Sequence, residues 1–351
     1  MSCIDLHCRL GRRSVLALGL AAGIAAVAQP APVGAAEGDW LKGQTVRLVV
    51  GYSPGGGYDS YARMLAPHFE KRTGATVIVE NKPGGGGMTA TNQLVRGKPD
   101  GLTMQVLNGE SAIMWQLVQQ TGVAYDMTKV SLLGRIQEEP HFMLVHPSLP
   151  DTLKEIVASG KKLKFTATRR IDNLGDYAAV MCEALKLNCQ IITGYKGSKE
   201  AGLAVMNGEA DALTISESSG FNYAQGGKTK IVATISHKRS ELMPNMPTVY
   251  EMFNLTPDQK WWIDFRLGVK AIGRCIIGPP GIPADKLAYL QKVWKEVLTD
   301  PAVIAEGKKT RHELDYEAPD KMKGTVRDLL ETLPADKLEN VREVLGKKYA
   351  S

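Results

Sequence analysis

Residues 53–59 read SPGGGYD and follow directly on the apolar stretch 46–52, which has the composition of a buried β-strand. A second strand-like stretch, 76–80, leads into residues 81–87, which read NKPGGGG. Because glycine has no Cβ and tolerates positive φ, both loops let the backbone approach a ligand closely. The helix expected after the first loop directs N–H groups and the positive end of its dipole at that loop. Two such junctions at the carboxyl edge of one sheet predict a pocket for an anion such as a carboxylate or phosphate.

Strand and helix patterns alternate around these loops and continue through most of the chain. Helical patterns such as 59–72 and 175–187 lie between most of the strand-like stretches. This alternation predicts α/β architecture with largely parallel sheets. Residues after 284 lack strand patterns, and amphipathic helices are expected there. The strand-like stretches are 45–52, 76–80, 102–107, 130–136, 142–146, 163–167, 190–192, 210–216, 231–236 and 274–277.

Two segments have the composition of a domain boundary, namely 138–140 and the irregular stretch 243–262, which is rich in proline and methionine. A chain that leaves one lobe, builds another and returns creates a hinge with a cleft between the lobes, as in periplasmic binding proteins. The terminal helices are expected to pack on the first lobe. The expected division is 37–139 plus 270–351 for the first lobe and 140–269, including the hinge crossings, for the second.

The composition of the 351 residues is that of a soluble globular protein, with 44% hydrophobic and 23% charged residues. The net charge of +6 is scattered along the chain. Because no run of lysine and arginine is interleaved with aromatic residues, nucleic acid is not an expected partner.

The first 36 residues have the pattern of an export signal. Arg12 and Arg13 precede a weakly apolar stretch at 15–28, and small residues follow at 34–36. The arginine pair followed by Ser14 is close to a twin-arginine signal, and a general secretory signal with adjacent arginines fits equally well. Either route leads out of the cytoplasm, so we expect a cleaved signal and a periplasmic protein.

Three cysteines remain after cleavage at Ala36, namely Cys182, Cys189 and Cys275. A disulfide between Cys182 and Cys189 fits an oxidising compartment. Three buried free thiols are the alternative, which the odd count supports, so both stay open at this point.

Two enzyme patterns in the sequence lack a required part. Residues 51–55 fit G-x-S-x-G, but the residue after the serine is Pro54, which has no N–H for an oxyanion hole. Residues 85–90 nearly match the dinucleotide fingerprint, with Glu110 as the ribose acid, yet Pro83 and four glycines make the loop longer and looser than that fingerprint. An exported NAD(P)-dependent oxidoreductase remains the alternative interpretation.

The sequence has no metal-binding signature. It contains neither H-E-x-x-H nor a paired C-x-x-C, and its histidines are scattered. His141 and His146 are expected to be structural or surface residues. We therefore expect neither a metal nor a cofactor.

The glycine loops and several further motifs together resemble the substrate-binding proteins of tripartite tricarboxylate transporters, also called Bug or TctC-type receptors. Residues 53–59 resemble the family's P-G-G-x-x-D loop, and 79–87 resemble V-x-N-[RK]-P-G-x-G-G. The resemblance spans nearly all of the mature chain. The further similar segments are 98–101 (KPDG), 195–197 (YKG), 207–211 (NGEAD), 246–251 (MPTVYE) and 278–283 (GPPGIP).

This resemblance implies a two-lobed, type II-like periplasmic binding protein that closes on a small organic anion. It implies delivery of that anion to a two-component membrane transporter. No set of residues suggests turnover, so we expect a receptor that is not an enzyme, and we expect it to be a monomer. A sensory receptor of the same fold would carry the same motifs, so that alternative also stays open. The expected ligand is a carboxylate, with a dicarboxylate or an aromatic acid as the more specific options.

The first glycine loop is expected to bind the ligand's carboxylate. Gly55, Gly56 and Gly57 would present backbone N–H groups, and Ser53 and Tyr58 would add hydroxyl donors. A plain tight turn is the competing interpretation. The second loop is evenly balanced between direct contact and support. Asp59 is expected to cap the following helix, and Glu110 to be solvated or to cap a helix, since either carboxylate would repel an anion.

Arg169 and Arg170 follow a predicted strand of the second lobe. The planar guanidinium pairs with a carboxylate in a bidentate way, so one of them is expected to hold the distal acid of a dicarboxylate. Two solvated charges on an exposed loop form the competing interpretation. The complete set of predicted binding residues is Ser53, Gly55, Gly56, Gly57, Tyr58, Gly86, Asn108, Ser111, Thr168, Arg169, Arg170 and Tyr195.

Overall fold

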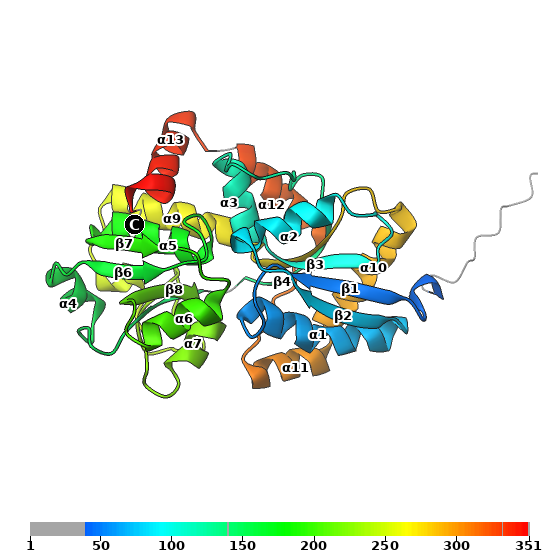
Figure 1. The fold of residues 1–351 in the computed structure, drawn as a ribbon, viewed down its shortest axis with the longest axis horizontal. Helices are drawn as coiled ribbons and strands as arrows, with labels where there is room; N and C mark the ends of the chain where they lie inside the picture. The colour runs from blue at the N-terminus through cyan, green and yellow to red at the C-terminus, as the bar shows by residue number, and fades with distance from the viewer. Residues whose placement is uncertain (1–38, 139, 332, 350–351) are drawn as a thin grey trace, which may run out of the picture. The chain divides into compact units, whose positions relative to one another are not determined.

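The computed structural model describes residues 39–138, 140–331 and 333–349, and the expected export segment 1–36 lies outside them. The described strands form two five-stranded sheets with helices packed against them (Figure 1). The first sheet has the strand order β2-β1-β3-β10-β4, and the second has the order β7-β6-β8-β5-β9. We call each sheet together with its helices a lobe.

In the first sheet, β1 pairs in parallel with β2 and β3, whereas β10 is antiparallel to both β3 and β4. β10 joins this sheet only after the chain has built the second sheet, so the chain has passed between the lobes twice by the time it reaches β10. Apolar side chains on β1, such as Val46 and Leu48, are fully buried, as the sequence pattern predicts. The bounds are β1 (Thr45–Val50), β2 (Thr76–Asn81), β3 (Thr103–Asn108), β4 (Ser131–Gln137) and β10 (Arg274–Gly278).

In the second sheet, β6 pairs in parallel with β7 and β8, and β5 is antiparallel to β8 and β9. The alternation of strands and helices confirms the predicted α/β class. The expected lobe limits stay predictions, and Glu139 at one of them lies outside the described residues. The bounds are β5 (His141–Val145), β6 (Leu163–Thr166), β7 (Cys189–Ile192), β8 (Ala212–Ser216) and β9 (Lys230–Ile235).

Helix α1 of the first lobe buries one apolar stripe. In α1 the side chains of Tyr61, Leu65 and Phe69 follow one another at four-residue spacing and are fully buried. Phe69 packs on Trp294 of α10 with ring centroids 4.7 Å apart. The helices are η1 (Asp39–Leu41), α1 (Gly57–Thr73), η2 (Gly85–Gly87), α2 (Met88–Val95), α3 (Gly109–Leu117), α10 (Ala284–Leu298), α11 (Pro301–Thr310) and α12 (Pro319–Glu331).

Helix α5 is the central helix of the second lobe, and all of its residues are buried. A disulfide between Cys182 of α5 and Cys189 of β7 ties the two elements together, and Cys275 is a buried thiol. The disulfide alternative is therefore the one that the structure contains. The helices of this region are α4 (Leu153–Ala158), α5 (Asn173–Leu185), α6 (Ser198–Met206), α7 (Glu217–Ala224), α8 (Val249–Met252), α9 (Pro257–Val269) and η3 (Lys270–Ile272).

The end of the chain corrects one detail of the predicted arrangement. Helix α10 packs on β4 and α1, and α12 packs on β4 and α3, as expected. The segment formed by α13 (Ala335–Glu343) and the π-helix η4 (Val344–Lys348) instead reaches the second lobe, where η4 packs on α5. Ile191 donates its N–H to the carbonyl of Tyr349 at 2.9 Å, and Lys348 binds Glu183 at 2.6 Å. The buried side chains of Val344 and Leu345 account for this packing.

Among the described residues, no helix combines the length and the apolarity that a membrane crossing requires.

Candidate functional site

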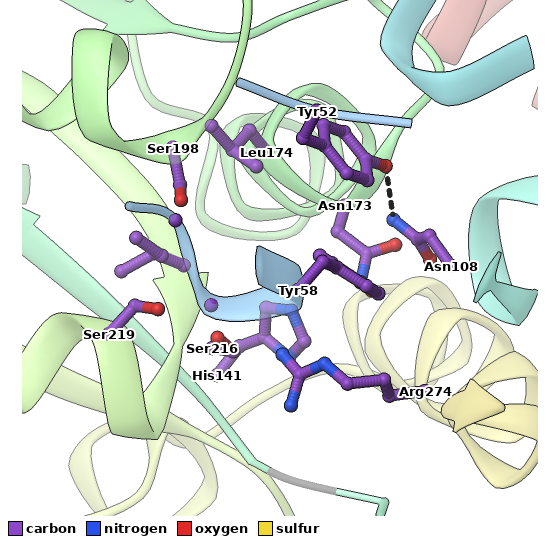
Figure 2. Close-up of a pocket in the computed structure, with 13 residues that line it drawn as sticks. Tyr52, Tyr58, Asn108, His141, Asn173, Leu174, Ser198, Ser216, Ser219 and Arg274 are labelled. Carbon is purple, nitrogen blue, oxygen red and sulfur yellow. Dashed lines mark hydrogen bonds between the residues drawn. The ribbon is translucent and has the colours of Figure 1, made fainter. Parts of the chain in front are cut away.

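A small pocket lies where the carboxyl edge of the first sheet meets residues of the second lobe (Figure 2). Its volume is about 30 Å³, which is room for about two or three water molecules. A larger ligand can enter only if the lobes part or the lining side chains move. The lining residues are Tyr52, Gly56, Gly57, Tyr58, Asn108 and Arg274 from the first lobe and His141, Asn173, Leu174, Ser198, Ile215, Ser216 and Ser219 from the second.

The first glycine loop forms one wall of the pocket. Helix α1 begins at Gly57, and its N-cap, Gly56, provides no side-chain cap. A Cβ on Gly56 would lie 3.0 Å from the Oγ of Ser198, and one on Gly57 would lie 2.9 Å from the Oγ of Ser219. The absence of side chains at these two positions therefore lets the second lobe approach the backbone at the positive end of α1.

Asp59 holds this loop from behind. Its carboxylate accepts a hydrogen bond from the N–H of Gly55 at 2.8 Å and from the amide of Asn81 at 2.9 Å, and it pairs with Arg63 at 2.9 Å. Partial burial raises the pKa of Asp59, but these hydrogen bonds outweigh that effect and lower the pKa below its ordinary value. Asp59 thus fixes the backbone of the loop and leaves the pocket side to Gly56 and Gly57.

A polar pair forms the next part of the wall. Asn108, at the end of β3, donates from Nδ2 to the hydroxyl of Tyr52 at 3.0 Å and accepts from the N–H of Ser111 at 3.1 Å. Ser111 is buried and donates from Oγ to Asn173 of α5 at 3.0 Å. Asn108 and Asn173 therefore line the pocket, while Ser111 supports them. Sequence reasoning missed Tyr52, which belongs to the apolar stretch before the loop.

Arg274 is the pocket-lining arginine among the described residues, and sequence reasoning missed it. It is the first residue of β10 and only 4% exposed. Its guanidinium lies over the rings of Tyr58 and Tyr61, at 4.5 and 4.1 Å from their centroids. Because β10 runs antiparallel to β3, Arg274 is paired with Asn108 and lies at the same sheet edge as the glycine loop.

The second lobe contributes hydroxyl groups and a histidine. Ser198 begins α6, and Ser216 and Ser219 lie at the start of α7. His141, the first residue of β5, is 1% exposed and stacks on Tyr177 at 3.9 Å. His141 therefore lines the pocket from a buried position, a placement that its sequence surroundings did not indicate.

The arginines predicted to bind a distal acid lie elsewhere. Arg169 donates from Nη1 to the carbonyl of Gly85 at 3.3 Å, and its guanidinium lies 5.9 Å from the ring centroid of Trp115. Arg170 donates to the carbonyl of Gly346 at 2.8 Å. Within the part of the chain that the structure describes, neither side chain lines the pocket. Their proposed contact with ligand stays a prediction that would require a different arrangement of the loop.

The remaining predicted residues surround the pocket without lining it, as far as the described residues show. Thr168 donates a hydrogen bond to Asp172, and a Cβ on Gly86 would lie 3.1 Å from both Thr168 and Arg169. Ser53 donates its N–H to the carbonyl of Lys196 at 3.2 Å, next to the partly buried Tyr195. The structure thus brings Gly56, Gly57, Tyr58 and Asn108 together in the pocket; the binding roles of the whole set stay predictions.

A buried ion-pair cluster joins the lobes beside the pocket and corrects the expectation for Glu110. Arg266 of α9 is fully buried, and it binds Glu110 of α3 at 2.8 Å and Asp176 of α5 at 2.7 Å. Glu110 is 3% exposed, so it is not solvated. Burial raises the pKa of Glu110, although Arg266 opposes that shift, and burial raises the pKa of Asp176 to about 6. Arg266 also reaches Asn173 at 3.2 Å and so fixes one pocket residue.

The described residues contain no group of three or more His, Cys, Asp or Glu side chains that could hold a metal ion. The chemistry of the pocket is therefore that of backbone N–H groups, hydroxyls, amides, one histidine and one guanidinium. Such groups suit reversible binding of an anion.

Comparison with solved structures defines the class to which this arrangement belongs. The periplasmic binding protein BugD is 22% identical, with a TM-score of 0.70 over 88% of this chain and 99% of that one. A Rhodopseudomonas palustris protein, Rpa4515 with adipate, is 19% identical, with a TM-score of 0.73 over the same shares. The fold is therefore that of the two-lobed periplasmic binding proteins, as the sequence predicted.

The sequence itself places the chain in a family. Residues 61–323 match the profile of the tripartite tricarboxylate transporter family receptor, TctC. A curated relative from Cupriavidus necator, the UPF0065 protein in the gbd 5'region, is 29% identical over 69% of this chain and 74% of its own. The chain belongs to the tripartite tricarboxylate transporter receptor family, whose members are solute-binding proteins rather than enzymes. Membership implies an exported protein.

Proposed function

We propose that this protein captures a small organic acid in the pocket between its lobes and delivers it to a tripartite tricarboxylate-type membrane transporter. The observation that carries the proposal is the pocket lining: the uncapped start of α1 at Gly56 and Gly57, the guanidinium of Arg274, and hydroxyls from the second lobe. A guanidinium and a helix start both favour negative charge. The partner is the two-component membrane part of such a transporter, and the receptor acts as a periplasmic monomer.

The ligand class follows from the same lining and from a neighbour. The solved neighbour that carries adipate has the same fold, and adipate has two carboxylates. Gly57 and Arg274 provide donors for one carboxylate, while Tyr52, Asn108 and Asn173 provide neutral hydrogen-bonding groups for the rest of the ligand. A mono- or dicarboxylate of modest length fits this arrangement of charged and neutral hydrogen-bonding groups. Aromatic acids belong to the same ligand class and are to be tested with them.

Closure of the lobes gives the site its specificity. The contacts that join the lobes next to the pocket, such as Arg266 with Glu110 and Ser111 with Asn173, are available only when the lobes are together. A ligand sealed between them must satisfy the polar groups that it covers, because an unpaired buried donor costs about 1–3 kcal/mol. Ligands that cover these polar groups without accepting their hydrogen bonds are therefore disfavoured.

A thermal-shift screen of the mature chain against mono-, di- and tricarboxylates tests the proposal, with calorimetric titration of each hit. A ligand that binds the folded state raises the Tm by mass action. We expect one or a few carboxylates to raise the Tm and to bind with one-to-one stoichiometry. NAD(P) and free nucleotides are included as the control panel. A response confined to nucleotides would replace this proposal with the exported oxidoreductase.

The transport role needs a separate measurement, because a sensory receptor of the same fold would bind ligand in the same way. Uptake of the radiolabelled carboxylate into vesicles that contain the membrane subunits is expected only when the receptor is added with its ligand. Ligand binding without receptor-dependent uptake would favour the sensory receptor.

A further inference from the structure

Arg274 reaches the pocket because of the way the chain returns to the first sheet. Residues 274–277 pair antiparallel with β3, with Arg274 opposite Asn108. The amino end of β10 therefore meets the carboxyl end of β3, at the edge where the first glycine loop lies. The side chain is 4% exposed and lines the pocket, where it extends toward His141 (Figure 2).

Aromatic rings fix the orientation of this guanidinium. Tyr58 and Tyr61 lie against it with centroids at 4.5 and 4.1 Å, and Tyr52 stacks on Tyr58 at 4.9 Å. Tyr61 is itself held by hydrogen bonds to Gln137 and to the carbonyl of Glu313. With rings against its faces, the guanidinium makes its hydrogen bonds at its edge, in one plane. A planar carboxylate matches that edge.

The edge of the guanidinium lies beside the start of α1. Its Nη2 is 3.2 Å from the position that a Cβ on Gly57 would occupy, and the Oγ of Ser219 is 2.9 Å from the same position. The guanidinium and the helix start of the first lobe and a hydroxyl of the second lobe thus border the same part of the pocket. A carboxylate bound there accepts from the two groups of the first lobe, and it gains the hydroxyl only when the lobes are together.

We propose that Arg274 is the residue that makes this receptor select a carboxylate over the corresponding neutral carboxamide. The inference rests on the proposed function and names the residue that recognises the acid. A carboxylate accepts from the guanidinium edge, whereas a carboxamide presents an NH2 group to one of the same donors and carries no charge. Arg274 itself donates from Nη1 to Gln137 at 3.5 Å, and its Nη2 lies on the side of Gly57. The selection does not depend on Arg169 or Arg170, because neither lines the pocket among the described residues.

The test is a comparison of acid and amide by calorimetry on the mature chain. Probes are acetate, succinate, adipate, malate, benzoate and citrate, each with its mono- or fully amidated counterpart. Variants are Arg274→Gln, Arg274→Lys and, as the matched control, Arg169→Gln. We expect the wild-type chain to prefer the acid by roughly 10- to 100-fold, the range for hydrogen bonds to a charged group. Arg274→Gln is expected to reduce that preference to about threefold or less, and Arg169→Gln to retain it.

Arg274→Lys separates recognition from support of the fold. Lysine keeps the charge but loses the planar fork, so we expect weaker binding with the acid still preferred. If Arg274→Gln does not fold, as judged by circular dichroism, Arg274→Lys decides: a reduced acid-to-amide ratio supports the inference, and an unchanged ratio overturns it. An unchanged acid-to-amide ratio in Arg274→Gln, or equal wild-type affinities for acid and amide, would overturn the inference while leaving a carboxylate receptor. A wild-type chain that binds no carboxylate of the panel would overturn the proposed function itself.

Discussion

The two glycine-rich loops of the first lobe, 53–59 and 81–87, have similar sequences but different surroundings. In the first, Gly56 and Gly57 border the pocket, and serines of the second lobe approach them. In the second, Gly84, Gly85, Gly86 and Gly87 all have positive φ, and Arg169 lies against the loop. Glycine at the pocket is thus required for close approach, and in the second loop it is required for the path of the backbone.

The comparison shows that a glycine run marks a place where a side chain is not tolerated. The neighbouring residues determine whether the reason is close approach by the other lobe or a positive φ. Arg169 donates to the carbonyl of Gly85, so it closes the second loop from the second lobe. Gly57 is approached as closely, by Ser219 and Arg274, but these residues and Gly57 line the pocket, which neither Gly85 nor Arg169 does among the described residues. We therefore expect substitutions in the first loop to change affinity and substitutions in the second to change stability.

The largest expected effect is on the free energy of unfolding and concerns Asp172. This residue supports the segment that carries Arg169 over the second loop. Asp172 accepts hydrogen bonds from the N–H groups of Leu174 and Gly175 and is fully buried. Burial raises its pKa to about 7 from 3.8. A raised carboxyl pKa adds stability that is fully present below the unfolded pKa and is lost as the pH rises through the folded pKa. At about 1.4 kcal/mol per unit, this contribution is at most about 4 kcal/mol.

The variant Asp172→Asn isolates this contribution, since other buried carboxyls remain in both chains. Urea unfolding at pH 4 to 8 is expected to show that the wild-type free energy of unfolding falls relative to that of Asp172→Asn as the pH rises. Parallel curves for the two chains would show that Asp172 does not titrate in this way.

Gly57→Val is expected to have the next largest effect, on affinity. A Cβ at this position would lie 2.9 Å from Ser219 and 3.2 Å from Arg274, so the larger side chain prevents the lobes from closing on a ligand. Overpacking of this kind costs about 1–3 kcal/mol, so calorimetry should show roughly 10- to 100-fold weaker binding of the best carboxylate. Gly57→Ala is the graded control and is expected to weaken binding less. Unaltered affinity in Gly57→Val would show that the first loop does not take part in ligand binding.

Gly86→Ala is expected to lower stability more than affinity. Gly86 has a φ of +68°, and a Cβ at this position would lie 3.1 Å from Arg169 and Thr168. The strain of a left-handed alanine is about 1–2 kcal/mol, so urea unfolding should show a loss of that size. Affinity for the same carboxylate should change less than in Gly57→Val. A variant that keeps its stability and loses affinity would instead make the second loop part of the binding surface.

Arg169→Gln is expected to have the smallest effect. The hydrogen bond from Arg169 to the carbonyl of Gly85 is long, at 3.3 Å, so its loss should lower the free energy of unfolding by about 0.5–1.5 kcal/mol. Binding of a dicarboxylate should remain within a few-fold of wild type. A large loss confined to dicarboxylates would restore Arg169 as the holder of a distal acid.

The sequence predicts the parts of this molecule that depend on local pattern. The alternation of strands and helices, the two glycine loops and the placement of Asn108 at the end of a strand all follow from neighbouring residues. Arg274 could not be found in this way, because its place depends on β10 being antiparallel to β3 across a long insertion. Glu110 is buried by Arg266, which lies 156 positions further along the chain. For the same reason the packing of the C-terminal segment on α5 was not predictable from helical patterns alone.

A crystal structure of the mature chain with its best carboxylate tests the central claim most directly. The account predicts that a carboxylate oxygen lies about 3 Å from the N–H of Gly57 and from the guanidinium edge of Arg274, with both lobes in contact with the ligand. A carboxylate bound at Gly85 and Arg169, or a pocket filled by a neutral or cationic molecule, would contradict it.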